Sequence, residues 1–545
     1  MSDATEFIKI CFITDLLDPK VYLYIIHSTT NSQKLFVSCD NNMENLRYII
    51  IALFISVTNI EASPSIIIIG AGPAGIAAAT KLLENNLTNI KILEAEPRIG
   101  GRIKSVKFGD SYVDLGARWC HGEDGNIVYN MVKDLHLLNS TKVAESFFLS
   151  SREEIEETFG KELMGIFYEM SDLPSSDSKD KYKSVGEVCE QRYRKTIQDK
   201  FSANPIKLKI ANEALGLLES FISSNEGAFS WYDSSFITDF KNCDGDFHLN
   251  FNGKGYKIIL DVMMKKYPDP RRSLPIDDKI FLNKEVTQIS WNSHRRGGNI
   301  KIKCSDNSMY TADHVITTPS VGVLKERAKY MFLPKLPTEK LKAIDEVGFG
   351  AVMKVIMHFS VNWWGNSPGF SFIWTEEDKI AVLREFPEGP TWNDRSWLTF
   401  IDMIVMADNN PNVFTVWFTG KLVPAIEFLS DELIIKGINF TLNKFLGHLY
   451  NIGEPDKILR SNWYANPHFR GTYSFQTVKS RLANEEKSVE EHLAAPLTDL
   501  EGRPIVLFAG EATHPHYYST VHGAIESGYR EAHRLLDLHH RHQLR

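Results

Sequence analysis

The chain has 545 residues and a formal net charge of -8, with 43% hydrophobic, 11% aromatic and 24% charged residues. Because one hydrophobic core rarely grows beyond about 250–300 residues, this length predicts at least two domains. The net negative charge gives no indication of a basic surface for nucleic acid. The composition is that of an ordinary globular protein, which excludes a disordered or repetitive chain. The cysteines have neither metal-ligand nor C-x-x-C spacing, so no metal site is predicted.

The first 64 residues form an extension before the first predicted domain. Within it, residues 43–62 combine Arg47, an apolar run from Tyr48 to Val57 and small residues at the end. This is the layout of a secretory signal peptide, and the run is too short for a stable membrane span. We therefore expect a secreted, extracellular protein, in which residues 1–42 are either a real extension or the product of a start site placed too far upstream. The alternative is a buried strand or helix in a cytoplasmic protein.

Two further features agree with secretion without requiring it. Sequons occur at Asn86, Asn139 and Asn439, although such triplets also arise by chance. An even number of cysteines follows the apolar run, which permits disulfides in a secreted protein.

A predicted buried strand and a glycine-rich turn open the next segment. Residues 65–69 read SIIII, a run typical of a strand buried on both faces of a parallel sheet. Gly70, Gly72 and Gly75 follow, as needed for a tight turn, close approach to a pyrophosphate and close helix packing. A second strand ends at Glu94, where a carboxylate can accept hydrogen bonds from ribose hydroxyls. The sequence predicts a dinucleotide site, with NAD and FAD both open at this point.

The segment after Glu94 favours FAD. It ends in Gly100-Gly101-Arg102, whose glycines allow another close backbone approach and whose guanidinium can pair with the pyrophosphate. This segment resembles the glycine–arginine motif of the flavin-containing amine oxidase family, whereas the alternative is a basic surface turn. The resemblance implies an enzyme that oxidises amines with FAD.

Residues 116–122 carry a second cluster of candidates. By resemblance, Gly116 and Arg118 belong to the flavin site. His121, flanked by Trp119, matches a histidine that animal polyamine oxidases place in the substrate tunnel, where it can bind an amine or shuttle a proton. A histidine beside glycine is otherwise often only a turn residue.

The middle of the chain resembles the family only diffusely, from about residue 140 to residue 240. In this region, Asp233 is the candidate for a carboxylate that anchors a distal substrate ammonium. Further on, residues 351–359 read AVMKVIMHF, a strand apolar on both faces that contains Lys354. Because a lysine is almost never buried without a partner, we predict a depressed pKa and a functional role, with an edge lysine reaching solvent as the alternative. The resemblance places Lys354 where the family holds a water near the flavin.

Two later segments resemble those that line the flavin in this family. Trp463 lies in one of them, and Tyr473 in the other would form a wall against the substrate. Thr472 stands where monoamine oxidases attach the flavin through a cysteine, which predicts non-covalent FAD. Thr520 stands where monoamine oxidases have a second tyrosine, so a wider site is expected.

The C-terminal segment completes the motif. A predicted strand at 506–509 leads to Glu511, and a helix starts after residues 517–522, which include Thr520 and Val521. A helix start aimed at the flavin would stabilise the negative charge that the ring gains on reduction. The resemblance covers about residues 65–536 and is greatest to animal spermine and N-acetylpolyamine oxidases. It implies these cofactor contacts: Glu94 with ribose, Arg102 with pyrophosphate, Val286 with adenine, Glu511 with the sugar-like chain, and Thr520 and Val521 with the ring.

The predicted fold class is α/β, with two domains after the extension. A discontinuous Rossmann-like FAD-binding domain would comprise residues 65–130, 245–330 and 465–540, and an α+β substrate-binding domain residues 131–244 and 331–464. The predicted reaction is hydride transfer to flavin from the carbon beside an amine of spermine, spermidine or an N-acetylpolyamine, with dioxygen reduced to hydrogen peroxide.

Alternative functions remain open at the level of sequence. A histone-demethylating amine oxidase would need a long coiled-coil insertion, which is not seen, and a desaturase-type flavoenzyme gives no reason for Lys354. Another flavin amine oxidase acting on a different amine, or a secreted protein that traps polyamines without turnover, would fit the same motifs.

Overall fold

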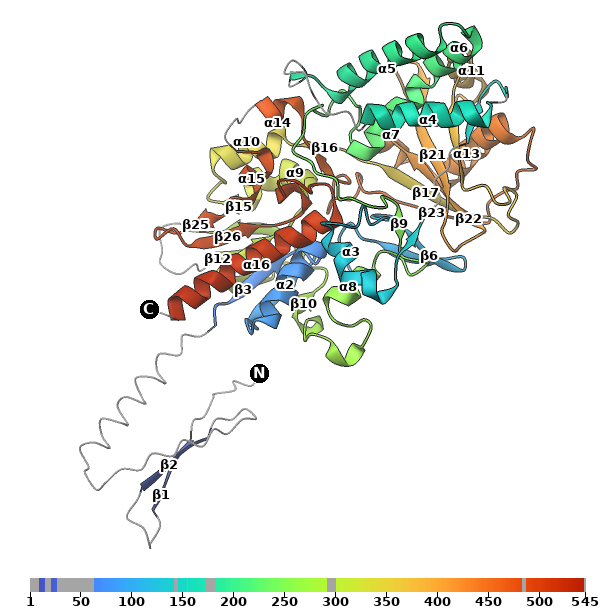
Figure 1. Cartoon of the computed structure of the whole chain (residues 1–545). Coiled ribbons are helices and arrows are strands. Elements are labelled where there is room, and N and C mark those ends of the chain that lie inside the picture. Colours follow the sequence, from blue (N-terminus) through green and yellow to red (C-terminus); the bar gives the residue numbers. More distant parts are fainter. Residues whose placement is uncertain are drawn as a thin grey trace. The chain divides into compact units, whose positions relative to one another are not determined.

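The computed structural model describes residues 9–14, 21–26, 63–141, 146–153, 155–171, 180, 182–291, 300–482 and 487–543. The chain divides into two units, Met1–Ser63 and Pro64–Arg545 (Figure 1). In the first unit, β1 (Lys9–Thr14) and β2 (Val21–Ile26) pair antiparallel. The predicted signal peptide at 43–62 lies outside the described residues. Within the described ranges, no helix is long and apolar enough to cross a membrane.

A six-stranded sheet carries the glycine-rich turn of the second unit. Its order is β10 (Ile280–Phe281), β4 (Ile90–Leu93), β3 (Ile66–Ile69), β14 (His314–Thr317), β26 (Pro504–Phe508) and β25 (Leu497–Thr498). Neighbouring strands are parallel except at the β26–β25 edge. Every residue of β3 is buried, as its apolar run predicts. Because the strands come from distant parts of the sequence, the sheet is discontinuous.

Two helices, α2 (Pro73–Glu84) and α16 (Val521–Gln543), pack side by side against one face of this sheet (Figure 1). Their close approach depends on Gly528, where a Cβ atom would lie 2.2 Å from the carbonyl oxygen of Ala74. Ile67 and Ile69 of β3 point to the opposite face and join a second core. That core lies under a four-stranded sheet and two helices: β13 (Met309–Ala312), β12 (Ile300–Cys304), β11 (Val286–Ser290), β15 (Phe332–Leu333), α9 (Val321–Met331) and α10 (Thr338–Glu346).

The second unit also contains a second six-stranded sheet. Its order is β23 (Lys457–Arg460), β17 (Met353–His358), β22 (Val413–Phe418), β21 (Ile401–Met406), β18 (Gly369–Ile373) and β8 (Phe147–Leu149). The strands are antiparallel except β18 and β8. One face packs on α13 (Asp431–Leu446). Near β8 and β18 lie the helices α4 (Glu157–Ser171), α5 (Val185–Phe201), α6 (Pro205–Glu213) and α7 (Leu215–Glu226).

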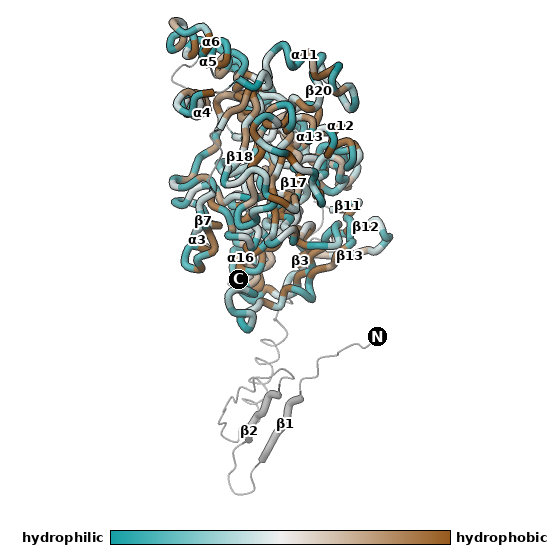
Figure 2. The backbone as a smooth tube through the Cα atoms, turned by 90° about the vertical axis from the view of Figure 1, so that its right-hand side faces the viewer, coloured by the Kyte–Doolittle hydropathy of each residue, from teal (hydrophilic) through white to brown (hydrophobic). Residues whose placement is uncertain are grey.

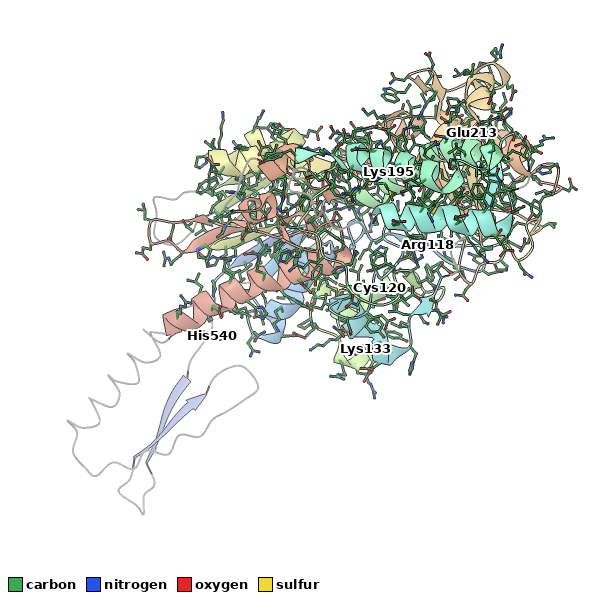
Figure 3. All side chains as sticks on the ribbon, turned by 45° about the horizontal axis from the view of Figure 1, so that its top comes forward. Arg118, Cys120, Lys133, Lys195, Glu213 and His540 are labelled. Atoms are coloured by element: carbon green, nitrogen blue, oxygen red, sulfur yellow. The ribbon has the colours of Figure 1, made fainter. Side chains whose placement is uncertain are left out.

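The distribution of hydrophobic residues follows these layers. Figure 2 shows hydrophobic residues along β17 and many hydrophilic residues on the outer helices. Lys195 and Glu213 lie on that helical layer, and Arg118 and Cys120 lie deeper in the unit (Figure 3). Four cysteines are buried and free, so none of these four forms a disulfide; they are Cys120, Cys189, Cys243 and Cys304.

Candidate active site

A cavity of about 1150 Å³ extends from the glycine-rich turn after β3 to β17 and β22 of the second sheet. Most of the residues predicted from the sequence line it: Gly70, Gly72, Glu94, Arg102, Gly116, Arg118, Trp119, His121, Val286, Lys354, Trp463, Tyr473, Glu511, Thr520 and Val521. Gly75 and Asp233 are not part of the lining. The fold therefore brings together residues that are up to about 450 positions apart, because strands from both ends of the chain are neighbours in one sheet.

The glycines have the roles that close approach requires. A Cβ atom at Gly72 would find Gly101 Cα as its nearest neighbour, at 3.8 Å, so the backbone of both glycines is accessible from the cavity. A Cβ atom at Gly75 would lie 2.0 Å from the carbonyl oxygen of Gly70. Gly75 thus packs α2 onto the turn, outside the cavity, whereas Gly72 keeps the turn open to a ligand.

Glu94 is a buried carboxylate at the end of β4. Its Oε2 accepts from the backbone N–H of Ala71 at 2.7 Å, and its Oε1 accepts from that of Glu96 at 2.8 Å. Burial raises the pKa of Glu94. Each oxygen keeps a second acceptor position, so the side chain is held in place and can still bind hydroxyl groups.

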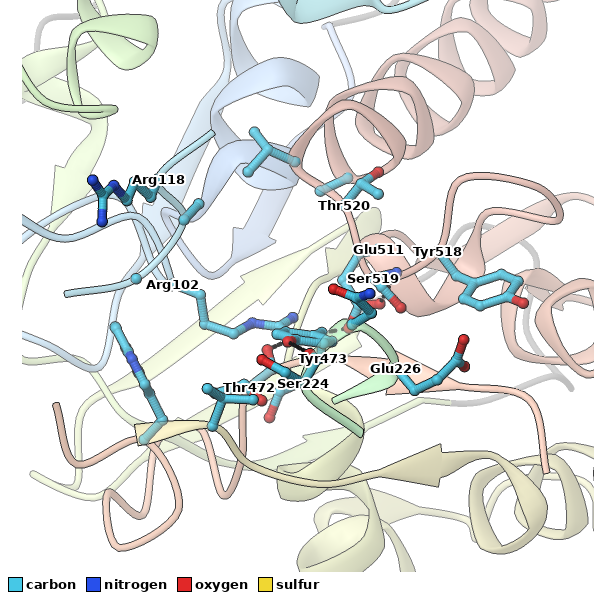
Figure 4. A pocket seen from close by; sticks show the side chains of 18 of the residues that line it. Arg102, Arg118, Ser224, Glu226, Thr472, Tyr473, Glu511, Tyr518, Ser519 and Thr520 are labelled. Carbon is cyan, nitrogen blue, oxygen red and sulfur yellow. Dashed lines mark hydrogen bonds and ion pairs between the residues drawn. The ribbon is translucent and has the colours of Figure 1, made fainter. Parts of the chain in front are cut away.

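Arg102 and Glu511 connect the first motif to the last. Nη1 of Arg102 donates to Glu511 Oε1 at 2.9 Å and to the carbonyl of Thr472 at 2.7 Å. The other oxygen of Glu511 accepts from Ser474 Oγ at 2.6 Å and from the Ser519 N–H at 2.7 Å (Figure 4). Since Glu511 is held by Ser474 and Ser519, it orients Arg102, whose remaining nitrogens have no hydrogen-bond partner among the described residues.

The start of α16 also faces the cavity. Thr520 Oγ1 accepts from the Gly523 N–H at 3.0 Å and donates to the carbonyl of Tyr517 at 2.6 Å. This caps one amide of the first turn, and the amides before it are available to a group with negative charge. Thr520 and Val521 line the cavity at this point.

Lys354 is 5% exposed and sits on β17, as its apolar strand predicts. Its Nζ donates to the carbonyls of Gly116 at 2.5 Å and Asp114 at 3.1 Å. Burial, followed by the charge of Arg118, lowers the pKa of Lys354 well below its usual range. Among the described residues no carboxylate forms an ion pair with Nζ. The structure thus provides an amine that is easily neutral, which is what a proton-transfer role needs.

Two tryptophans form a stack beside Lys354. The rings of Trp119 and Trp417 are parallel, with centroids 5.6 Å apart. Lys354 Nζ lies 4.3 Å from the centroid of Trp417, and the guanidinium of Arg118 lies 4.7 Å from that of Trp119. Arg118 also donates to Asp408 Oδ2 at 3.1 Å, so its charge is paired. Sequence analysis did not identify Trp417, because a tryptophan in an apolar strand has the pattern of a core residue.

His121 offers an acceptor to the cavity. Its Nδ1 donates to the carbonyl of Phe247 at 2.7 Å, which leaves Nε2 without a proton in the neutral ring. Burial, followed by the neighbouring His248, lowers the pKa of His121 to about 4. The imidazole is therefore neutral at ordinary pH and can accept a hydrogen bond from a ligand.

Glu226, a carboxylate that the sequence analysis missed, lines the cavity, whereas the predicted Asp233 does not. Asp233 is exposed and outside the cavity lining, whereas Glu226, at the end of α7, lines the cavity near Tyr473 (Figure 4). Burial raises the pKa of Glu226 to about 7. Tyr473 itself donates to the carbonyl of Ser224, and its ring packs on Gly227. No sequence signal marked Glu226.

The part of the cavity lined by α4 and α7, called the tunnel here, is mostly apolar. Its lining includes Met164, Phe167, Tyr168, Leu217, Phe221 and Phe236. Together, the open backbone at Gly72, the carboxylate of Glu94, the guanidinium of Arg102 and the start of α16 fit an adenine dinucleotide. The apolar tunnel, Glu226 and His121 leave room for a second, cationic molecule beside it.

Comparison with known proteins agrees with this division. A family described as flavin containing amine oxidoreductase matches residues 73–536. The peroxisomal N(1)-acetyl-spermine/spermidine oxidase of Homo sapiens is 28% identical over 520 residues, covering 89% of this chain and 97% of that protein. Probable polyamine oxidase 5 of Arabidopsis thaliana is 28% identical over 549 residues, covering 86% and 98% respectively. Polyamine oxidase 1 of Zea mays is 26% identical over 492 residues, covering 87% and 90%.

Proposed function

The chain belongs to the flavin-containing amine oxidoreductase family and is an FAD-dependent amine oxidase, and from this premise we propose that its substrate is a polyamine and its electron acceptor dioxygen. When bound, FAD accepts a hydride equivalent from the carbon beside the substrate nitrogen. Glu94, Arg102, Val286 and the start of α16 would hold the cofactor. Thr472 offers no thiol for a covalent bond, and its hydroxyl donates to the carbonyl of Gly350 at 3.3 Å, which supports non-covalent binding.

The protein must supply a neutral amine to the reacting position, because only an uncharged nitrogen can release electrons toward the cofactor. Nε2 of His121 can accept a hydrogen bond from an entering amine and orient it, since its ring is neutral. Lys354 Nζ, with its lowered pKa, can hold a water in the cavity and pass a proton to or from it. The stacked rings of Trp119 and Trp417 exclude bulk water from the space beside Lys354 Nζ.

The observation that carries the substrate class is Glu226. Its carboxyl has no cation beside it among the described residues, although it lines a tunnel of aromatic side chains. Aromatic faces with a few acceptors bind flexible cations, and the C-terminal end of α7 favours positive charge as well. Three of the relatives named above are oxidases of polyamines by name, which supports the same substrate class.

An anaerobic absorbance titration tests the proposal. Purified holoenzyme would be titrated with spermine, spermidine, N-acetylspermine and a simple monoamine while the oxidised flavin band is followed. We expect bleaching by one of the polyamines at far lower concentration than by the monoamine, and recovery in air with release of hydrogen peroxide. A flavin band unmoved by any polyamine would reject polyamine oxidation, and binding without bleaching would indicate a protein that traps polyamines.

We also propose that the protein is secreted. The layout of residues 43–62 supports this proposal, as does the exposure of Asn86 and Asn139 in two of the three sequons. Asn439 is different because it is 7% exposed and its Nδ2 donates to Glu454 Oε2 at 2.5 Å. A folded protein has no room for a glycan at that position.

A further inference from the structure

Strand β21 contains an irregularity at Asp402. Ile401 pairs with Phe418 and Met403 pairs with Trp417, so Asp402 is an extra residue opposite a continuous partner strand. In regular strands successive side chains alternate between the two faces, whereas a bulge turns an additional side chain to one of them. Ile401 belongs to the core on the far face, and both Asp402 and Met403 line the cavity. The bulge is therefore what aims Asp402 into the substrate cavity.

The Asp402 carboxyl is buried and only half satisfied. The side chain is 1% exposed, and the Ser224 hydroxyl is its one side-chain hydrogen-bond partner among the described residues. Oδ2 has no partner there, and the same is true of Nε1 of Trp417, which pairs with Met403, the residue after Asp402. Buried polar atoms are almost always hydrogen-bonded in native proteins, so this part of the lining is built to meet a polar ligand or water. Burial also raises the pKa of Asp402 to about 7.

The surroundings of Asp402 select for a cationic ligand. The two cations of this region are already engaged: Lys354 Nζ donates to two carbonyls, and Arg118 pairs with Asp408. The phenol of Tyr473 is the other ionisable group that interacts with Asp402, and it also interacts with Glu226. A carboxylate in such surroundings lowers its free energy most by meeting a positive group.

The sheet register places Asp402 away from the reacting amine. Lys354 pairs with Trp417, and Trp417 pairs with Met403, so Asp402 lies two strand spacings from Lys354, which is roughly 10 Å. A ligand group at Asp402 is therefore not the group that is oxidised near Lys354.

We propose that Asp402 is a specificity-determining residue that binds a second ammonium group of the substrate through Oδ2, so that the cavity selects polycationic amines over monoamines. The inference rests on the proposed polyamine substrate. It adds to Glu226 a second anchoring carboxyl, on β21 and not on α7, and it gives the bulge a function.

The experiment compares wild-type holoenzyme with Asp402→Asn, which keeps the shape of the side chain and removes its charge. Spermine and octylamine would be titrated anaerobically by calorimetry, and kcat and KM would be measured for both. We expect the Kd and KM for spermine to rise at least about tenfold more than those for octylamine, since one charge-assisted hydrogen bond is lost. The kcat for spermine should change much less than its KM. Asp233→Asn, an exposed carboxylate outside the cavity, serves as the matched control.

An unchanged spermine Kd in an Asp402→Asn protein with normal FAD content would overturn the inference, and so would equal losses for the two amines. If the Asn variant does not load FAD, Asp402→Ser is the second variant, with the same expectations. A wild-type protein that binds spermine without oxidising it would refute the proposed oxidase, while the calorimetry would still decide the role of Asp402. A wild-type protein that binds no spermine would refute both.

Discussion

Lys354 Nζ lies 2.5 Å from the carbonyl oxygen of Gly116, although Lys354 lies in a strand and Gly116 in a loop from a different motif. This hydrogen bond joins β17, in the second six-stranded sheet, to the loop that follows β6 (Ser111–Asp114). The lysine therefore has a fixed position, and its buried amine is directed to the cavity.

Replacement of Lys354 by methionine should leave FAD bound and slow turnover. We expect at least about a hundredfold lower kcat, in the range found for loss of a proton-transfer group. Lys340→Met is the matched control, because Lys340 is also buried and its Nζ also donates to two backbone carbonyls, but it is not part of the cavity lining. That variant should lower the Tm and keep the rate per bound flavin. Steady-state rates that are unchanged in Lys354→Met would remove the lysine from the mechanism.

Glu511→Gln should reduce the FAD content. The substitution removes the carboxylate that orients Arg102, and the loss of one charge-assisted hydrogen bond costs about 1.5–3 kcal/mol, or about ten- to a hundredfold in FAD affinity. The ratio of flavin to protein absorbance after dialysis measures the effect. Glu501→Gln, an exposed residue, is the control. Full flavin occupancy and unchanged affinity in Glu511→Gln would mean that Arg102 is positioned by Thr472 alone.

His121→Asn should lower kcat/KM while keeping the bond to Phe247, because an amide N–H can replace Nδ1–H. We expect a loss on the order of a hundredfold. Since the pKa of His121 is about 4, its ring is neutral above pH 5 and should cause no inflection near pH 6.5 in the pH profile of the wild type. An inflection near pH 6.5 that disappears in His121→Asn would show that the ring is protonated in the free enzyme. His516→Asn, at a position outside the cavity lining, controls for general effects.

Glu490 should make the protein less stable as pH rises. Burial raises its pKa from 4.5 to about 7, and the folded state therefore keeps a proton that the unfolded state has already released. Stability is fully present below about pH 4.5 and is lost as pH rises through 7, because the folded state binds more protons in that window. Glu490→Gln should keep the hydrogen bond with Gln476 and reduce this loss, by on the order of 3 kcal/mol at pH 8.

Thermal unfolding at pH 5.5 and pH 8 measures the effect. The difference in Tm between the two pH values should be smaller in Glu490→Gln than in the wild type, and unchanged in the exposed control Glu153→Gln. An identical difference in all three proteins would show that Glu490 ionises normally in the fold.

Secretion should leave glycans at two sequons and not at the third. Expression of the full chain in insect cells should give a protein in the medium whose N-terminus follows residue 62. Asn86→Gln and Asn139→Gln should each remove one glycosidase-sensitive step in mass, whereas Asn439→Gln should not. An unmodified protein retained inside the cells would contradict the proposed localisation.

The parts of the fold that could be predicted were those that leave a simple pattern. The run at 65–69 became β3, and the apolar strand around Lys354 became β17, because burial on both faces requires a continuous apolar sequence. The helix predicted after His522 became α16, which starts two residues earlier, at Val521.

The substrate side of the cavity could not be predicted in the same way. Asp402 faces the cavity only because of a bulge, which a period of two in the sequence does not reveal. Glu226 is the last residue of α7 and Asp233 lies in the turn region that follows, and tertiary contacts alone decide that Glu226 faces the tunnel and Asp233 the solvent. Which of two nearby carboxylates points inward is a property of packing and not of local pattern.

The interleaved order of the first sheet has a consequence for how the protein is made. β3 is synthesised early, but its site is completed by β14, β26 and finally α16, whose Gly528 packs on the turn of α2. Such long-range pairing delays folding until nearly the whole chain has left the ribosome. A chain that ends before residue 521 would keep the glycine-rich turn and still be unable to load its cofactor, and it would expose an all-isoleucine strand to aggregation. We therefore expect cofactor loading to depend on an intact α16, whose first residue lines the cavity.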